Sequence, residues 1–89
     1  MLNNKQCELA RVMTQDTTDN FQINNEFNTL NSSTKTNITS AIDELLKLHD
    51  MPIDKGFEVM KKDFIQIANE FSISPATLFC IYMDNKKPL

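Results

Sequence analysis

The sequence predicts an all-α protein, a small helical domain of four to five short helices. Apolar residues recur at steps of three and four along most of the chain, which places them on one face of a helix. One glycine and three prolines among 89 residues leave few tight turns, and a many-stranded sheet needs such turns. A chain this short buries roughly 60–65% of its unfolded surface, and many such chains gain stability by oligomerising.

Residues 1–35 are predicted to form a polar N-terminal arm that carries one or two short helices. In the first predicted helix, 3–15, the apolar stripe consists of Leu9, Val12 and Met13 together with Cys7. The second predicted helix covers 21–30, where helical spacing is favoured over the alternation of a strand. Residues 31–37 contain no apolar side chain and are predicted to form a loop.

Residues 36–89 are predicted to form the helical core. Apolar positions recur at helical spacing from Ile38 to His49, and Pro52 ends this helix because the residue before a proline avoids helical torsion angles. In the next segment one helix face would carry Phe57, Met60, Phe64, Ile67 and Phe71. Such a stripe faces either the domain core or a partner helix. Pro75 then suits the first turn of a last helix.

Residues 64–83 have the pattern of two short helices that cross at a steep angle. Ala68 is a small residue at the predicted crossing, and Ser72 is a small residue at the start of the turn. Ile73 is an apolar residue that fills the turn, and Leu78 and Ile81 are the apolar residues expected to face inward. This pattern resembles the helix-turn-helix of small bacterial and phage regulators, in which glycine is commoner than serine at the turn. The resemblance implies a DNA-binding regulator of the phage or mobile-element type, which we expect to be dimeric.

The resemblance also implies which side chains would contact DNA. The candidate contact residues for DNA or a protein partner lie in the last helix and its start, and among the lysines that flank the motif. They are Ser74, Ala76, Thr77, Phe79, Cys80 and Met83, and the lysines Lys61, Lys62, Lys86 and Lys87. Base-reading helices present polar donors and acceptors, whereas this helix is mostly apolar. An exposed patch of Phe79, Cys80 and Met83 would be typical of a protein contact. The alternative hypothesis is therefore a protein–protein interaction module or inhibitor that docks helix 75–85 on a partner or self-associates.

The charge distribution leaves both hypotheses open. The formal net charge is -3, whereas dedicated nucleic-acid binders usually have a strong basic bias. Residues 55–89 carry five lysines against four acidic residues, and residues 1–54 carry four basic against eight acidic residues. A third hypothesis is that residues 1–35 fold on a ligand.

Motifs for catalysis, metal binding or cofactor binding are absent from the sequence. The only glycine is Gly56, which excludes a glycine-rich phosphate loop, and the only histidine, His49, suits the last turn of a helix. Cys7 and Cys80 have no zinc-site spacing, and we expect both to be free thiols. We expect a protein that is not an enzyme, has no cofactor, does not enter the membrane and lies in the cytoplasm.

Overall fold

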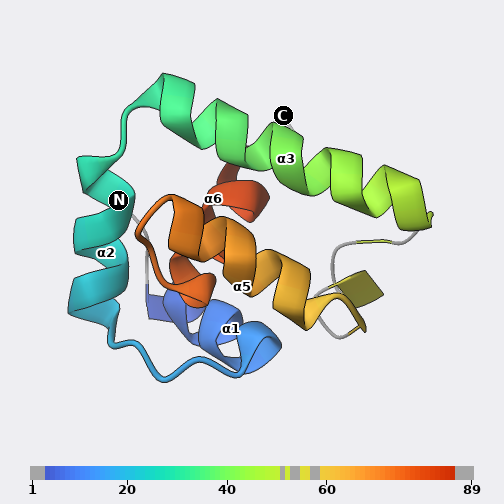
Figure 1. The fold of residues 1–89 in the computed structure, drawn as a ribbon. Coiled ribbons are helices and arrows are strands. Elements are labelled where there is room, and N and C mark those ends of the chain that lie inside the picture. Colours follow the sequence, from blue (N-terminus) through green and yellow to red (C-terminus); the bar gives the residue numbers. More distant parts are fainter. Residues whose placement is uncertain (1–3, 51, 53–54, 57–58, 86–89) are drawn as a thin grey trace.

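The computed structural model describes residues 4–50, 52, 55–56, 59–60 and 61–85, and within them every regular element is a helix. Figure 1 shows the arrangement, in which the helices are α1 (Asn4–Thr14), α2 (Asn20–Thr29), α3 (Ser32–His49), α5 (Lys61–Glu70) and α6 (Pro75–Asn85). The predicted all-α class is therefore confirmed.

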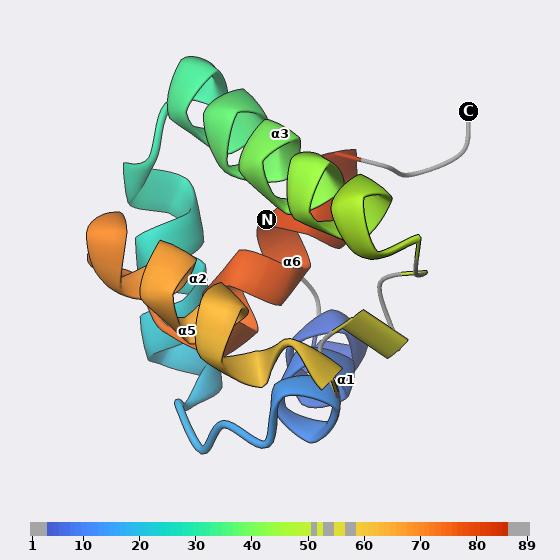
Figure 2. The same ribbon diagram turned by 45° about the vertical axis from the view of Figure 1, so that its right-hand side comes forward.

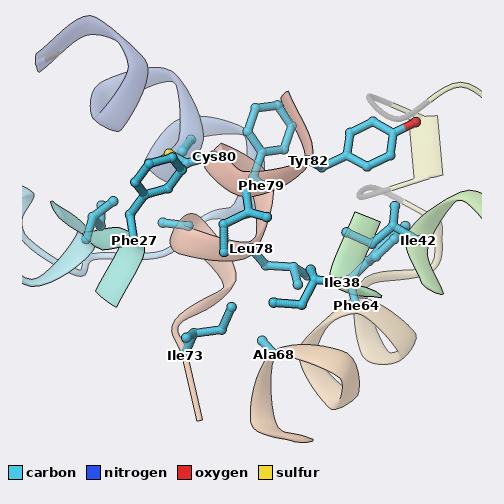
Figure 3. Close-up of a cluster of buried hydrophobic side chains, with 14 of the residues drawn as sticks. Phe27, Ile38, Ile42, Phe64, Ala68, Ile73, Leu78, Phe79, Cys80 and Tyr82 are labelled. Atoms are coloured by element: carbon cyan, nitrogen blue, oxygen red, sulfur yellow. The ribbon is translucent and has the colours of Figure 1, made fainter. Parts of the chain in front are cut away.

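Helix α6 lies at the centre of the fold. It packs against α1, α2, α3 and α5, and the two ribbon views show it enclosed by them (Figures 1 and 2). Every residue from Ala76 to Tyr82 is buried, so no side of these two turns faces water. In Figure 3 the labelled side chains of α6 point in several directions, toward residues of the surrounding helices. A helix that is apolar on all sides can be stable only in such a position.

Helices α1 and α2 belong to the same core, so the predicted division into an arm at 1–35 and a core at 36–89 is wrong. Cys7 and Ala10 of α1 and Ile23 and Phe27 of α2 lie in one buried cluster with the side chains of α6. Apolar residues are sparse in the N-terminal segment, and this sparseness is what predicts an arm there. Small residues nevertheless let a helix approach its neighbour closely, which large apolar side chains would prevent.

The face of α1 that points inward differs from the predicted one. The buried residues are Cys7, Ala10 and Thr14, which follow one another at steps of three and four. Leu9 and Val12, which were expected on the apolar stripe, are exposed, and Val12 retains 70% of its accessible surface. The predicted face was the one with the more hydrophobic side chains. The observed inner face carries small side chains because α1 lies close to α6.

The predicted loop at 31–37 is helical, because α3 begins at Ser32. Asn31 caps this helix, and its side-chain Oδ1 accepts a hydrogen bond from the backbone N–H of Thr34 at 2.8 Å. Such a cap satisfies an N–H group that the first helical turn leaves without a partner. The polar residues that suggested a loop therefore form the solvated first turns of a helix. The C-terminal end at His49 agrees with the prediction, and Asp50 closes the helix in a left-handed conformation.

Helices α5 and α6 are bent by 91° relative to each other around a short break. Ser72 adopts a positive φ of 58°, and the N–H of Ile73 donates to the carbonyl of Ala68 at 3.0 Å. Ala68, Ile73, Leu78 and Ile81 are all buried, which agrees with the inward positions expected for them. Right-angled helix pairs occur in many helical folds, so the accessibility of α6 decides whether such a pair can contact DNA.

The apolar stripe of the segment before this break is mainly a core stripe. Met60 and Phe64 are buried, while Ile67 and Phe71 are only partly buried against the core. Phe57, the first member of the predicted stripe, lies outside the described residues. The stripe was expected to face either the domain core or a partner helix. Met60 and Phe64 face the core, whereas part of the Ile67 side chain remains accessible.

None of the helices in the described residues combines the length and hydropathy needed to cross a membrane; α5 and α6 meet that test only as a bent pair, on length and composition alone.

Replacing Phe64 by alanine should lower the free energy of unfolding by about 3–5 kcal/mol, because the substitution leaves a cavity in the core. Phe64 has no accessible surface, whereas 82% of the surface of Phe21 is exposed. Phe21→Ala removes the same atoms from the surface and should change stability by no more than about 0.5 kcal/mol. Urea unfolding followed by circular dichroism measures both. Equal losses in the two variants would contradict the central position of Phe64.

Candidate functional site

The structure does not present the predicted contact residues of α6 on one surface. Ala76, Thr77, Phe79 and Cys80 are buried, and Ser74 is partly buried. Met83 alone among the predicted α6 residues is exposed, with 42% of its surface accessible. The prediction of an apolar patch formed by Phe79, Cys80 and Met83 is therefore wrong. Phe79 and Cys80 are buried because α1 and α2, which were not predicted to belong to the core, cover α6.

The N-terminus of α6 is closed by two carboxylates of the same chain. Oε1 of Glu26 accepts hydrogen bonds from the Ser74 N–H (3.1 Å), the Ser74 hydroxyl (2.9 Å) and the Thr77 hydroxyl (2.6 Å). Oδ2 of Asp16 accepts from the N–H of Ala76 at 3.1 Å. A helix N-terminus attracts anions through its free N–H groups and its dipole. Here Glu26 and Asp16 take the place that a DNA phosphate would need.

Of the predicted lysines, Lys61 and Lys62 lie at the end of α5 that is remote from the turn into α6. Lys61 and Lys62 are exposed at the start of α5, and Nζ of Lys61 donates to Oε1 of Gln15 at 3.0 Å. The length of α5 puts roughly 15 Å between them and the turn that leads into α6. Lys86 and Lys87 lie outside the described residues. Lys61 bonds to Gln15, which precedes the capping residue Asp16, whereas the hydroxyl groups of Ser74 and Thr77 bond to Glu26.

Glu26 has a depressed pKa that reflects its role as an acceptor. Partial burial raises the pKa, but the hydrogen bonds from Thr77 and Ser74 outweigh it and hold the pKa below its ordinary value of 4.5. Hydrogen bonds to the charged form of a carboxyl group favour ionisation. Glu26 went unnoticed in the sequence, although it follows the buried Ile23 at a step of three and so lies beside the inner face of α2.

Both cysteines are free thiols, as expected, and both are buried. The pKa of Cys80 is raised to about 12, mainly by burial and also by the neighbouring Cys7 and Asp84, while Arg11 acts in the opposite direction. Tyr82 also has a pKa raised to about 12, by burial and by its hydrogen bond of 2.9 Å to Oδ1 of Asp43. A thiol that stays protonated in an apolar environment is inert, because the thiolate is the nucleophile.

An open cavity lies on the outside of the fold, between α3 and α5. This groove, which we call the α3–α5 groove, has a volume of about 450 Å³ and is lined by Ala41, Glu44, Leu45, Leu48, Asp63, Gln66 and Ile67. Both helices pack more closely on α6 than on each other, and they run side by side in opposite directions (Figures 1 and 2). The groove is the space left between their outer faces.

The α3–α5 groove is apolar at its base and acidic at its rim. Leu45 and Ile67 are partly buried, while Leu48 on one wall keeps 79% of its surface exposed. Glu44 of α3 and Asp63 of α5 are both exposed, and no basic side chain belongs to the lining. Such a surface suits an apolar ligand with positive charge at its edges.

Sequence reasoning missed this groove because it treated the apolar residues of α3 as one stripe. The structure separates them into an inner stripe of Ile38, Ile42 and Leu46 and an outer stripe of Ala41, Leu45 and Leu48. A helix that buries one face usually shows polar residues on the others. The signal that could have indicated the groove is the presence of Leu48 outside the inner stripe.

A second hollow of about 330 Å³ lies between α2 and the turn that joins α5 to α6, and its lining includes Glu26, Leu30, Phe71 and Ile73.

Within the described part of the chain, no group of three or more His, Cys, Asp and Glu side chains is placed to hold a metal ion. Comparisons with protein-family models, with curated proteins and with solved structures find no match to this chain.

Replacing Glu26 by glutamine should lower the free energy of unfolding by about 0.5–2 kcal/mol near neutral pH, because α6 loses its capping carboxylate. The folded-state pKa of Glu26 lies below its ordinary value, so the contribution is present above pH 4.5 and is lost as the pH falls through the folded-state value. The difference between the variant and the native chain should therefore shrink in acid.

Urea titrations at neutral pH and at about pH 3 measure this difference. Glu70→Gln is the matched control, because Glu70 is exposed on α5 and the same change should leave stability nearly unaltered at both pH values. An equal loss for Glu26→Gln at neutral and acid pH would show that the charge of Glu26 does not stabilise α6.

Cys80 should react slowly with a disulfide reagent in the folded protein, because the thiol is buried and stays protonated at pH 8. A Cys7→Ser variant leaves Cys80 as the only thiol, and its reaction with an aromatic disulfide reagent can be timed with and without guanidinium. We expect slow reaction when folded and rapid reaction when unfolded. Immediate reaction of the folded variant would contradict the burial of this side chain.

Proposed function

We propose that this protein is an interaction module that binds a segment of another protein in the α3–α5 groove. The observation that carries the proposal is the exposed leucine at the mouth of an apolar groove with an acidic rim. This proposal keeps the protein-docking alternative and moves its surface from α6 to the outer faces of α3 and α5. Complete burial of a leucine side chain is worth about 1.5–3 kcal/mol, which favours a partner that covers Leu48.

The groove dimensions suit an amphipathic helix as the bound segment. Ala41, Leu45 and Leu48 follow one another at steps of four and three along α3 and extend over about 10 Å, or two helical turns. Ile67 of α5 forms the opposite wall. Two turns of a partner helix would place two or three apolar side chains between these walls, which is a common mode of peptide recognition.

DNA binding, the other hypothesis from the sequence, has less support. The steep angle between α5 and α6 suits a helix-turn-helix, but the base-reading face of α6 would have to include Phe79 and Cys80, which are buried. The end of α6 that would meet a phosphate already holds Glu26 and Asp16. The formal net charge of -3 also opposes binding to a polyanion.

The proposal predicts that Leu48→Glu weakens peptide binding. A displayed library of amphipathic helical peptides is selected on the native chain, and the affinity of the selected peptides is measured by isothermal titration calorimetry. A glutamate in the apolar groove should weaken them by at least about tenfold, since a tenfold change corresponds to 1.4 kcal/mol. The matched control is Val12→Glu, which places the same charge on an exposed apolar site of α1.

Three outcomes of the binding assays would contradict the proposal. One is that no peptide is enriched, and another is that selected peptides bind Leu48→Glu as well as they bind the native chain. The third is a shift of duplex DNA that weakens steeply with salt and is unaffected by Leu48→Glu. A mass measurement by light scattering runs in parallel, and a dimer that Leu48→Glu dissociates would assign the groove to a second copy of this chain instead.

A further inference from the structure

We infer that the segment bound in the α3–α5 groove is a cationic amphipathic helix, with lysine or arginine side chains on both sides of its apolar stripe. This inference rests on the proposed function and specifies the chemistry of the partner. The inference follows from the charged residues around the groove. The proposed docking itself is supported by a different observation, the apolar lining of the groove.

Negative charge lies on both walls of the groove. Glu44 belongs to α3 and Asp63 to α5, and both line the groove with exposed side chains. Glu70 follows Asp63 two helical turns later on the same side of α5, and it is also exposed. Since no basic residue belongs to the lining, a bound helix would meet carboxylates on either side of its apolar face.

These charges should contribute more to the choice between amphipathic helices of different charge than to the affinity of the groove for any one of them. An exposed ion pair contributes about 0.2–1 kcal/mol, so two or three pairs at the rim change affinity by roughly tenfold. A helix with glutamate at the same positions would bring like charges together and bind more weakly still. The net charge of -3 on the whole chain also attracts a cationic segment from a distance.

A second copy of this chain fits the groove less well. The exposed stripe of α1 contains Leu9 and Val12 with Lys5 at one end, but Glu8 lies beside them. Docking α1 in the groove of another copy would bring Glu8 toward Glu44 and Asp63. Two chains of equal negative charge also repel each other, so a cationic segment of a different protein is the better occupant.

The inference is tested with three designed helical peptides, each about four turns long. They share one leucine and isoleucine stripe and differ only at the flanking positions, which carry lysine, glutamine or glutamate. Fluorescence anisotropy measures their binding to the full chain at low and at high salt. We expect the lysine peptide to bind about tenfold more tightly than the glutamine peptide and the glutamate peptide to bind most weakly, with the preference reduced at high salt.

Variants of the chain then locate the charges that act. The double variant Glu44→Gln/Asp63→Asn should weaken the lysine peptide by about tenfold and leave the glutamine peptide unchanged. Glu8→Gln/Asp84→Asn is the matched control, because it removes the same net charge from exposed sites outside the groove and should have little effect. Leu48→Glu should reduce binding of the glutamine peptide, which reports docking without the charge preference.

The outcomes separate the inference from the proposed function. Equal binding of all three peptides, lost in Leu48→Glu, would keep the groove as a docking site and overturn its preference for a cationic partner. A lysine preference that the two double variants reduce equally would also overturn it, because the attraction would then come from net charge alone. Failure of every peptide to bind would count against the proposed function itself.

Discussion

A helix without a polar face has to be enclosed on every side, and this constraint on α6 shapes the whole molecule. From Ala76 to Tyr82 the helix carries no charged residue, and all of these side chains are buried. Four helices are needed to cover it, which explains why a chain of 89 residues uses its N-terminal third for packing. The close approach of α1 depends on Cys7 and Ala10, because larger side chains would hold the two helices apart.

Enclosing α6 also encloses its polar N-terminus, and the fold provides acceptors for it. An unpaired backbone N–H in a buried place costs about 1–3 kcal/mol, so the end of a central helix needs partners from its neighbours. Glu26 from α2 and Asp16 from the connection between α1 and α2 supply them. The same two carboxylates remove the feature that would make this helix end attractive to a phosphate. Packing and function are linked at this point, because the residues that complete the fold occupy the expected DNA contact.

With α6 inside, the surface available for recognition lies on the helices around it. Helix α3 buries Ile38, Ile42 and Leu46 in the core, whereas Leu45 and Leu48 line the outer groove. Helix α5 similarly buries Phe64 while Ile67 reaches the groove. The carboxylates of Glu44 and Asp63 lie beside these apolar side chains. An apolar base with an acidic rim can both bind an amphipathic helix and discriminate against one that carries the wrong charge.

The sequence by itself determined the helical class, the break before Pro75, the end of α3 at His49 and the inward positions of Ala68, Ile73, Leu78 and Ile81. These features depend on local periodicity and on residues that cap or interrupt helices, and both are properties of short segments. The tertiary structure alone decided that α1 turns its small residues inward, that Glu26 and Asp16 cap α6, and that Phe79 and Cys80 are buried. Periodicity shows which residues share a helix face, but burial of that face depends on the shape and packing of distant segments.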